Sequence, residues 1–306
     1  MAESKKSLVA DGSLLLLSTL LVNAGNYAIN LLLGRWLGPA DFSEVSLLVT
    51  FLLMVSFFAL AFQLTAAKFT ATNEAIKPSE SSFGIVNLLN KKAIKEGIIL
   101  SLSLILILSF SKKYFHLDSI IPFAIFAISM PFYLLMSINR GYLQGKLSYK
   151  HLAITYQTEM WVRLIFTILL VYLGLRVNGV AVALLLSLLA TWCISRYLTK
   201  TETSTESVDP KIILNFFKMV LIYEFSQILI NNSDIVLVKH FFEPTEAGLY
   251  AALALVGRIV YFGTWTVVTL LFPMVIKLEK EGKNSLPVFF GGLGVVMTIA
   301  AIITLV

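Results

Sequence analysis

Leu31-Leu-Leu-Gly-Arg-Trp-Leu-Gly-Pro39-Ala-Asp41-Phe-Ser43 joins two apolar segments near the start of the chain, and Val236-Leu-Val-Lys-His-Phe-Phe-Glu-Pro244-Thr-Glu246-Ala-Gly248 joins another two. When Pro244 is placed on Pro39, an offset of 205 residues, Glu246 falls on Asp41 and Gly248 on Ser43. Repeated multi-span halves are typical of transporters, because alternating access is usually built from two related bundles that rock about a shared cavity. The repeat therefore predicts a membrane protein made of two related helical bundles.

The composition places the chain in a bilayer. Of its 306 residues, 58% are hydrophobic and 14% are charged, and the mean hydropathy is +0.84. A soluble domain of this size could not bury so much apolar surface. Nine apolar segments have about the 20-residue length that a membrane-spanning helix needs. We predict an all-α polytopic membrane protein with spans near residues 14–34, 43–67, 95–111, 119–139, 152–173, 178–198, 212–238, 247–274 and 287–306.

The basic residues predict the orientation of the chain. With the N-terminus inside, 17 of the 24 Lys and Arg residues, Arg140 among them, fall in inside segments and 5 fall in outside segments. Short cytoplasmic loops collect Lys and Arg, so a cytoplasmic N-terminus is expected. The net charge of +6 therefore indicates orientation and not nucleic-acid binding, which would require basic residues clustered with aromatic ones on a soluble face.

The cysteine and histidine residues predict no cofactor or metal. The single cysteine, Cys193, lies in an apolar run, and the three histidines, His116, His151 and His240, are scattered over predicted loops. No disulfide framework or zinc site follows from this pattern.

A polar linker divides the predicted bundles. Six spans separate the two repeated stretches, so both stretches lie outside and the halves run parallel. The least apolar segment of the chain, 199–210, is the natural boundary. We expect residues 1–205 to form a six-helix N-terminal bundle and residues 206–306 to form the first three helices of a second bundle. A second bundle of equal length would extend to about residue 411 at the same offset, so we expect the chain to be truncated by about three helices.

Several short motifs occur in an order that resembles a known family. They are Gly34-Arg-Trp-Leu-Gly-Pro-Ala-Asp-Phe42, Arg140-Gly-Tyr-Leu-Gln-Gly145, Asn232-Ser-Asp-Ile-Val-Leu-Val238, Glu246-Ala-Gly-Leu-Tyr250, Gly257-Arg258 and Leu271-Phe-Pro273. The set is similar to the polysaccharide-biosynthesis family of oligosaccharide flippases, whose superfamily (MOP) also holds MATE-type multidrug antiporters and lipid II flippases. The resemblance implies a MATE-like fold of two six-helix bundles with a cavity between them. It also implies movement of an undecaprenyl-diphosphate-linked oligosaccharide, for lipopolysaccharide or capsule, across the bacterial inner membrane, with that lipid-linked glycan and membrane lipids as partners.

Polar residues inside spans predict the cavity, because each is costly in hydrocarbon unless it faces protein or water. Asn23, Asn26 and Asn30 share one face of the first span, and Asn26 falls on Asn231 of the seventh span at the repeat offset. The alternative is helix–helix hydrogen bonding, which such amides also provide in membranes. The predicted substrate cavity comprises Asn23, Asn26, Asn30, Gln63, Arg163, Gln227, Asn231 and Arg258.

Charged residues within spans have two interpretations. Glu159 and Arg163 are four residues apart and can neutralise each other. Arg258 has no carboxylate three or four residues away, and a diphosphate would suit its planar guanidinium. Glu159, Glu224 and Asp234 are the candidates for coupling transport to H⁺ or Na⁺.

Three functions are compared at this point. A MATE-like cation or drug antiporter is the alternative to a flippase within the transporter class, and its cavity would be dominated by carboxylates and aromatics. A membrane-embedded glycan polymerase or glycosyltransferase would need catalytic carboxylates and a long soluble loop. All predicted outside loops are short, so we expect a transporter and not an enzyme.

Overall fold

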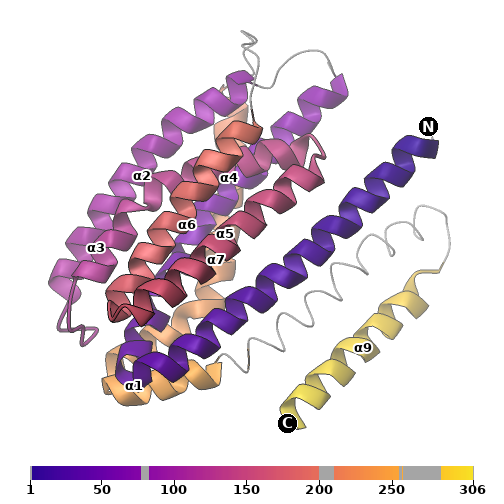
Figure 1. The fold of residues 1–306 in the computed structure, drawn as a ribbon. Coiled ribbons are helices and arrows are strands. Elements are labelled where there is room, and N and C mark those ends of the chain that lie inside the picture. Colours follow the sequence, from indigo (N-terminus) through magenta and orange to yellow (C-terminus); the bar gives the residue numbers. More distant parts are fainter. Residues whose placement is uncertain (1, 77–82, 200–209, 255–256, 258–283, 306) are drawn as a thin grey trace. The chain divides into compact units, whose positions relative to one another are not determined.

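The described part of the chain is helical and contains no strand (Figure 1). The computed structural model describes residues 2–76, 83–199, 210–254, 257 and 284–305. Its helices are α1 (Ala2–Ile76), α2 (Phe83–Ser111), α3 (Ile121–Ile128), α4 (Met130–Gly145), α5 (Tyr149–Tyr172), α6 (Arg176–Leu198), α7 (Pro210–Phe241) and α9 (Leu286–Leu305).

The prediction of an all-α membrane protein is confirmed, although the number of nine spans is not. Among the described residues, six segments are long and apolar enough to cross a membrane: Leu17–Thr72, Gly84–Phe110, Ile121–Gly145, Tyr149–Tyr172, Arg176–Leu198 and Pro210–Phe241. The first of these contains two predicted spans, because α1 continues through the stretch that joins them. The predicted span 247–274 lies mostly outside the described residues, and α9 carries a shorter apolar stretch, Leu286–Thr298.

A single glycine divides α1 into two halves that run in different directions (Figure 1). Gly38 has φ 76° and ψ 170°, a conformation that glycine adopts readily because it has no Cβ. Pro39 follows and supplies no backbone N–H for the helical ladder. The first repeated stretch is therefore a sharp corner inside a long helix.

Small residues bring α4 against the second half of α1. A Cβ added at Gly141 would overlap the Gln63 carbonyl oxygen, and one added at Gly145 would lie 2.6 Å from the Ala67 carbonyl oxygen. Glycines four residues apart allow helix backbones to approach closely in membranes. This crossing places Arg140, which precedes Gly141, against the interior of the bundle.

Helix α7 packs on the second half of α1. Phe217 lies 4.6 Å from Phe62 and Phe225 lies 5.1 Å from Phe57, measured between ring centroids. Ile213, Phe217 and Val220 of α7 also belong to a buried cluster formed with α1, α2 and α4. The packing of α7 therefore depends on an apolar face along its first half.

The structure separates into two compact units, Met1–Gly248 and Leu249–Val306. The first unit includes α7, whereas the sequence predicts a bundle boundary near residue 205. Packing in one conformation does not report which helices move together, so the division into bundles at residue 205 stays a prediction.

Candidate functional site

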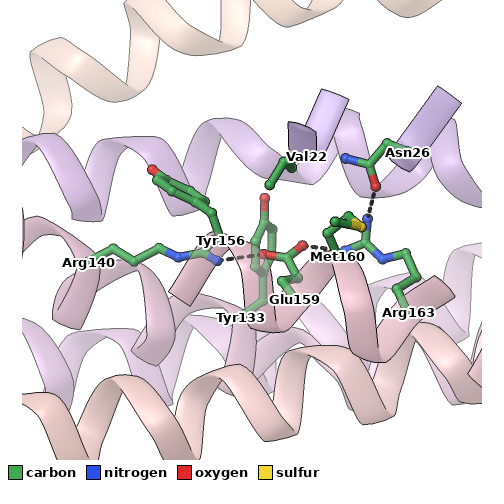
Figure 2. A pocket seen from close by; sticks show the side chains of 8 residues that line it. All are labelled: Val22, Asn26, Tyr133, Arg140, Tyr156, Glu159, Met160 and Arg163. Carbon is green, nitrogen blue, oxygen red and sulfur yellow. Dashed lines mark hydrogen bonds and ion pairs between the residues drawn. The ribbon is translucent and has the colours of Figure 1, made fainter. Parts of the chain in front are cut away.

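A cavity of about 210 Å³ lies between α1, α4 and α5 within the first unit (Figure 2). Its lining combines charged, amide and aromatic side chains with two apolar ones. The lining residues are Val22, Asn26, Tyr133, Arg140, Tyr156, Glu159, Met160 and Arg163. Three of the residues singled out in the sequence, Asn26, Glu159 and Arg163, therefore meet in one cavity.

Glu159 lies between two guanidinium groups (Figure 2). Its Oε2 is 2.8 Å from Arg140 Nη2, and its Oε1 pairs with Arg163 Nη2. The i,i+4 ion pair expected between Glu159 and Arg163 is thus present. With two cations and one carboxylate, the charged groups lining this cavity leave one positive charge in excess. Such a cavity favours an anion over a cation.

Arg140 is held by more partners than the carboxylate alone. Its Nε donates to Thr155 Oγ1 and its Nη2 to the Thr155 carbonyl oxygen, both at 3.0 Å. Its guanidinium carbon lies 4.2 Å from the centroid of the Tyr156 ring, which is within range of a cation–π interaction. Arg140 is therefore a buried cavity residue whose guanidinium is held in one orientation.

The sequence interpretation of Arg140 was wrong. It was assigned to an inside loop, but α4 continues to Gly145 and the Arg140 residue is 5% exposed. Counting Lys and Arg in loops assumes that a basic residue at the end of a span faces solvent. Such a count contains no information on where two helices cross. The signal that could have identified Arg140 is the pair Gly141 and Gly145, which directly follows it and has the four-residue spacing of a close helix contact.

Arg163 retains free hydrogen-bonding capacity. Besides Glu159, its contact is a long one of 3.5 Å from Nη1 to Asn26 Oδ1. Its Nε is buried and has no hydrogen-bond partner among the described residues. A buried donor without an acceptor is costly, so an acceptor entering the cavity would be favoured here.

The remaining predicted residues of α1 surround this cavity without lining it. Gln63 Nε2 donates to Gln144 Oε1 at 3.0 Å and to the Tyr156 hydroxyl at 3.2 Å, so it adjoins the cavity through Tyr156. Asn30 Nδ2 donates to the Asn26 carbonyl oxygen at 2.8 Å. Asn23 is half-buried. The bonds of Gln63 to α4 and α5 are the helix–helix hydrogen bonds that were the alternative to cavity lining, whereas the bond of Asn30 lies within α1.

The predicted polar residues of α7 are not brought to this cavity. Gln227 and Asn231 are exposed in the first unit, and Asn231 Nδ2 donates to the Gln227 carbonyl oxygen at 2.8 Å. Glu224 and Asp234 are half-buried elsewhere on the same helix. Arg258 lies outside the described residues.

Comparison with known proteins identifies the family and the fold. The family model described as "Polysaccharide biosynthesis protein" matches residues 8–279. No functionally curated protein matches the sequence.

Several solved transporter structures are similar to the chain. An inward-facing multidrug resistance MATE transporter of the MOP superfamily matches with a TM-score of 0.73 and 14% identity, over 93% of this chain and 68% of that one. An outward-facing MATE transporter matches with a TM-score of 0.63 and 14% identity, over 89% and 72%. A MOP superfamily transporter from Pyrococcus furiosus, described by the reverse polarity of its binding pocket, matches with a TM-score of 0.68 and 15% identity, over 98% and 70%.

At these identities the structural matches show the fold alone, which is the MATE-like fold expected from the resemblance. The apolar helices indicate a multi-pass membrane protein. Because the family model matches most of the sequence, the chain belongs to the polysaccharide biosynthesis protein family.

Proposed function

We propose that this protein is a flippase that moves an undecaprenyl-diphosphate-linked oligosaccharide across the bacterial inner membrane by alternating access. The observation that carries the proposal is the charge of the cavity, where Arg140 and Arg163 face the single carboxylate of Glu159. Guanidinium groups match phosphate oxygens in geometry as well as in charge. An antiporter of cationic drugs would need the opposite charge balance.

The two arginines have different roles in this proposal. Arg140 is anchored by Thr155 and stacked on Tyr156, so it provides a fixed positive charge. Arg163 has a buried, unpartnered Nε and a long contact to Asn26, so it is the group that turns toward an incoming phosphate. Glu159 holds both guanidiniums in place while the cavity is empty. A substrate anion competes with Glu159 for Arg163.

The cavity size fits one part of the substrate. A volume of about 210 Å³ suits a phosphate-containing group and is too small for an oligosaccharide. We propose that the sugars occupy the larger space between the two bundles, 1–205 and 206–306, while the lipid tail stays in the bilayer. Gln227, Asn231 and Arg258 are proposed to line that space, and the N-terminus is proposed to be cytoplasmic.

Ion coupling is proposed to use α7. Glu159 accepts from two guanidiniums and is therefore a poor proton or sodium site in this conformation. Glu224 and Asp234, half-buried on α7, are the better candidates for binding H⁺ or Na⁺.

The transporter from Pyrococcus furiosus indicates that pocket polarity is informative about function in this fold. Its description connects the reverse polarity of its binding pocket with a different function. The polarity of the pocket is thus a property that differs among proteins of this fold. For the present chain, the excess of positive charge supports an anionic substrate.

The test is complementation of a flippase-deficient bacterium, scored by cell-surface glycan and by accumulation of the lipid-linked precursor. We expect the full protein to restore the glycan and to clear the precursor. Arg163→Ala and Asn26→Ala should reduce rescue about tenfold or more, while both variants remain at normal levels in the membrane. The matched control is Arg196→Ala, which removes an exposed arginine at the end of α6. Equal rescue by Arg163→Ala and the control, or drug resistance in place of glycan export, would overturn the proposal.

A further inference from the structure

The first unit contains a buried lysine far from the cavity. Lys239, near the end of α7, is 2% exposed, and its Nζ donates to Ser43 Oγ at 2.8 Å. The carboxylates of Glu44 and Asp118 attract the Lys239 ammonium electrostatically. Glu44 is itself buried, and its Oε1 accepts from the Asp118 backbone N–H at 2.6 Å. Ser43, Glu44 and Lys239 are called the repeat latch below.

A charge buried to this degree places strict requirements on its surroundings. Removing an ammonium from water is costly unless opposite charge and hydrogen-bond acceptors replace the water. Lys239 finds both in residues that precede it by almost 200 positions. If the end of α7 moved away from the start of the second half of α1, Lys239 and Glu44 would each need water or a new partner. The latch therefore favours two states, closed or hydrated, over intermediate positions.

Two further contacts are made by the end of α7 and by the segment that follows it. The His240 ring stacks on the Tyr114 ring at 3.4 Å between centroids and 3° between planes, and His240 Nδ1 lies 3.0 Å from the Tyr114 carbonyl oxygen. A Cβ added at Gly248 would overlap the Pro39 carbonyl oxygen, so the two backbones are in close contact. Two of these contacts, Lys239 with Ser43 and Gly248 with Pro39, thus join the two repeated stretches, and His240 adds a contact with the segment after α2.

The rest of α7 is held by different interactions. Toward its start, Phe217 and Phe225 pack on Phe62 and Phe57 through apolar rings. Apolar surfaces of this kind are non-directional and tolerate small sliding movements. Between these rings and the latch, Gln227 and Asn231 are exposed within the first unit. A cation also lies against the start of α7, where Lys68 Nζ is 3.7 Å from the centroid of the Phe216 ring. The latch differs from these contacts because its hydrogen bond joins the two repeated stretches.

We propose that the repeat latch keeps the two repeats together at one end of the transporter, and that its release opens the substrate pathway to that face of the membrane. The inference rests on one part of the proposed function, namely that the two repeats belong to bundles that move apart during transport. It assigns to Lys239 the role of a tethered cation that neutralises Glu44 only in the closed state.

The test measures accessibility in the full protein and needs no substrate. Cys193, an exposed residue and the single cysteine, is first replaced by serine. Ala247, which is 4% exposed and adjoins Gly248, is then replaced by cysteine as a reporter. Its reaction with a membrane-impermeant maleimide is followed in right-side-out and inverted vesicles. The variants are Lys239→Ala, Glu44→Gln and the matched control Lys218→Ala, which removes an exposed lysine from the same helix.

We expect Lys239→Ala and Glu44→Gln to accelerate labelling at least about tenfold from one face of the membrane, because each removes one charge from a buried group of opposite charges and leaves the remaining charge less compensated. Lys218→Ala should label at the parent rate. Parent rates from both faces in Glu44→Gln, with the protein eluting as a single folded species, would overturn the latch even if Lys239→Ala failed to fold. Faster labelling of the latch variants, together with a parent protein that fails to restore the glycan, would support the latch and count against the proposed substrate.

Discussion

At the scale of single residues, Glu159 decides how much positive charge the cavity presents. It is the common partner of Arg140 and Arg163, and its side chain is 17% exposed. When one partner of a buried charge pair is removed, the remaining charge costs about 3–5 kcal/mol in a dry site. The cavity of about 210 Å³ admits water and lowers that cost.

We therefore predict that Glu159→Gln lowers the melting temperature of the detergent-solubilised protein and that added pyrophosphate restores it. The anion replaces the lost carboxylate, and ligand binding to the folded state stabilises it by mass action. The measurement is a thermal melt with and without pyrophosphate, with Glu96→Gln as control, because Glu96 forms a partly exposed ion pair with Lys92 on α2. A Glu159→Gln protein whose melting temperature does not respond to pyrophosphate would contradict anion binding at this cavity.

Sequence analysis anticipated part of the cavity at this scale. The pairing of Glu159 with Arg163 follows from helical spacing, which is local and can be read directly. The second guanidinium of the cavity, Arg140, comes from another helix, and its position depends on how α4 crosses α1. Gln227 and Asn231 of α7 were predicted to share a cavity with Asn26, and they do not line the cavity described here. Their place in a space between the bundles stays a prediction, because a repeat offset does not determine how helices pack.

At the scale of helices, the α4–α1 crossing sets the position of Arg140. Gly141 and Gly145 lie directly against the α1 backbone, where a methyl group has no room. Overpacking of a close contact costs about 1–3 kcal/mol. The glycines thus hold in place a residue of the cavity that they do not themselves line.

We predict that Gly141→Ala lowers the melting temperature and also weakens pyrophosphate binding, because separation of α4 from α1 displaces Arg140. Thermal melts and pyrophosphate titrations check both effects. Gly294→Ala in α9 is the matched control, since a Cβ there meets nothing within 4 Å. A Gly141→Ala protein that matched this control in both measurements would show that the crossing tolerates a larger residue.

Helix content was easier to predict than helix number. The predicted spans 152–173, 178–198 and 212–238 correspond well to α5, α6 and α7. In contrast, α2 begins at Phe83, before the predicted span 95–111, and α4 continues to Gly145, past the predicted end at 139. The first two predicted spans join as one helix with a corner at Gly38, because the corner uses one glycine conformation and not a loop. Arg35, Pro39 and Asp41 predict a break between the two spans, and the chain makes that break as a corner within continuous helix.

At the scale of the whole molecule, charge asymmetry predicts the orientation. With the N-terminus inside, the sequence places 17 basic residues in inside segments and 5 in outside segments. Without the buried Arg140 and Lys239, 16 and 4 remain, and the asymmetry persists. We predict that an epitope placed at Ala2 is protected from protease in intact spheroplasts and is cleaved in inverted vesicles. An epitope inserted in the outside turn after Gly174 should show the opposite pattern, and reversal of both patterns would overturn the orientation.

The contact between Gly248 and Pro39 has a consequence for the symmetry of the chain. In a two-fold dimer, the same patch of both partners lies at the axis and meets its own copy. Here the stretch around Pro39 meets the stretch around Pro244 within one polypeptide. The chain thus brings together, within one polypeptide, two related stretches that a symmetric dimer would supply from two subunits.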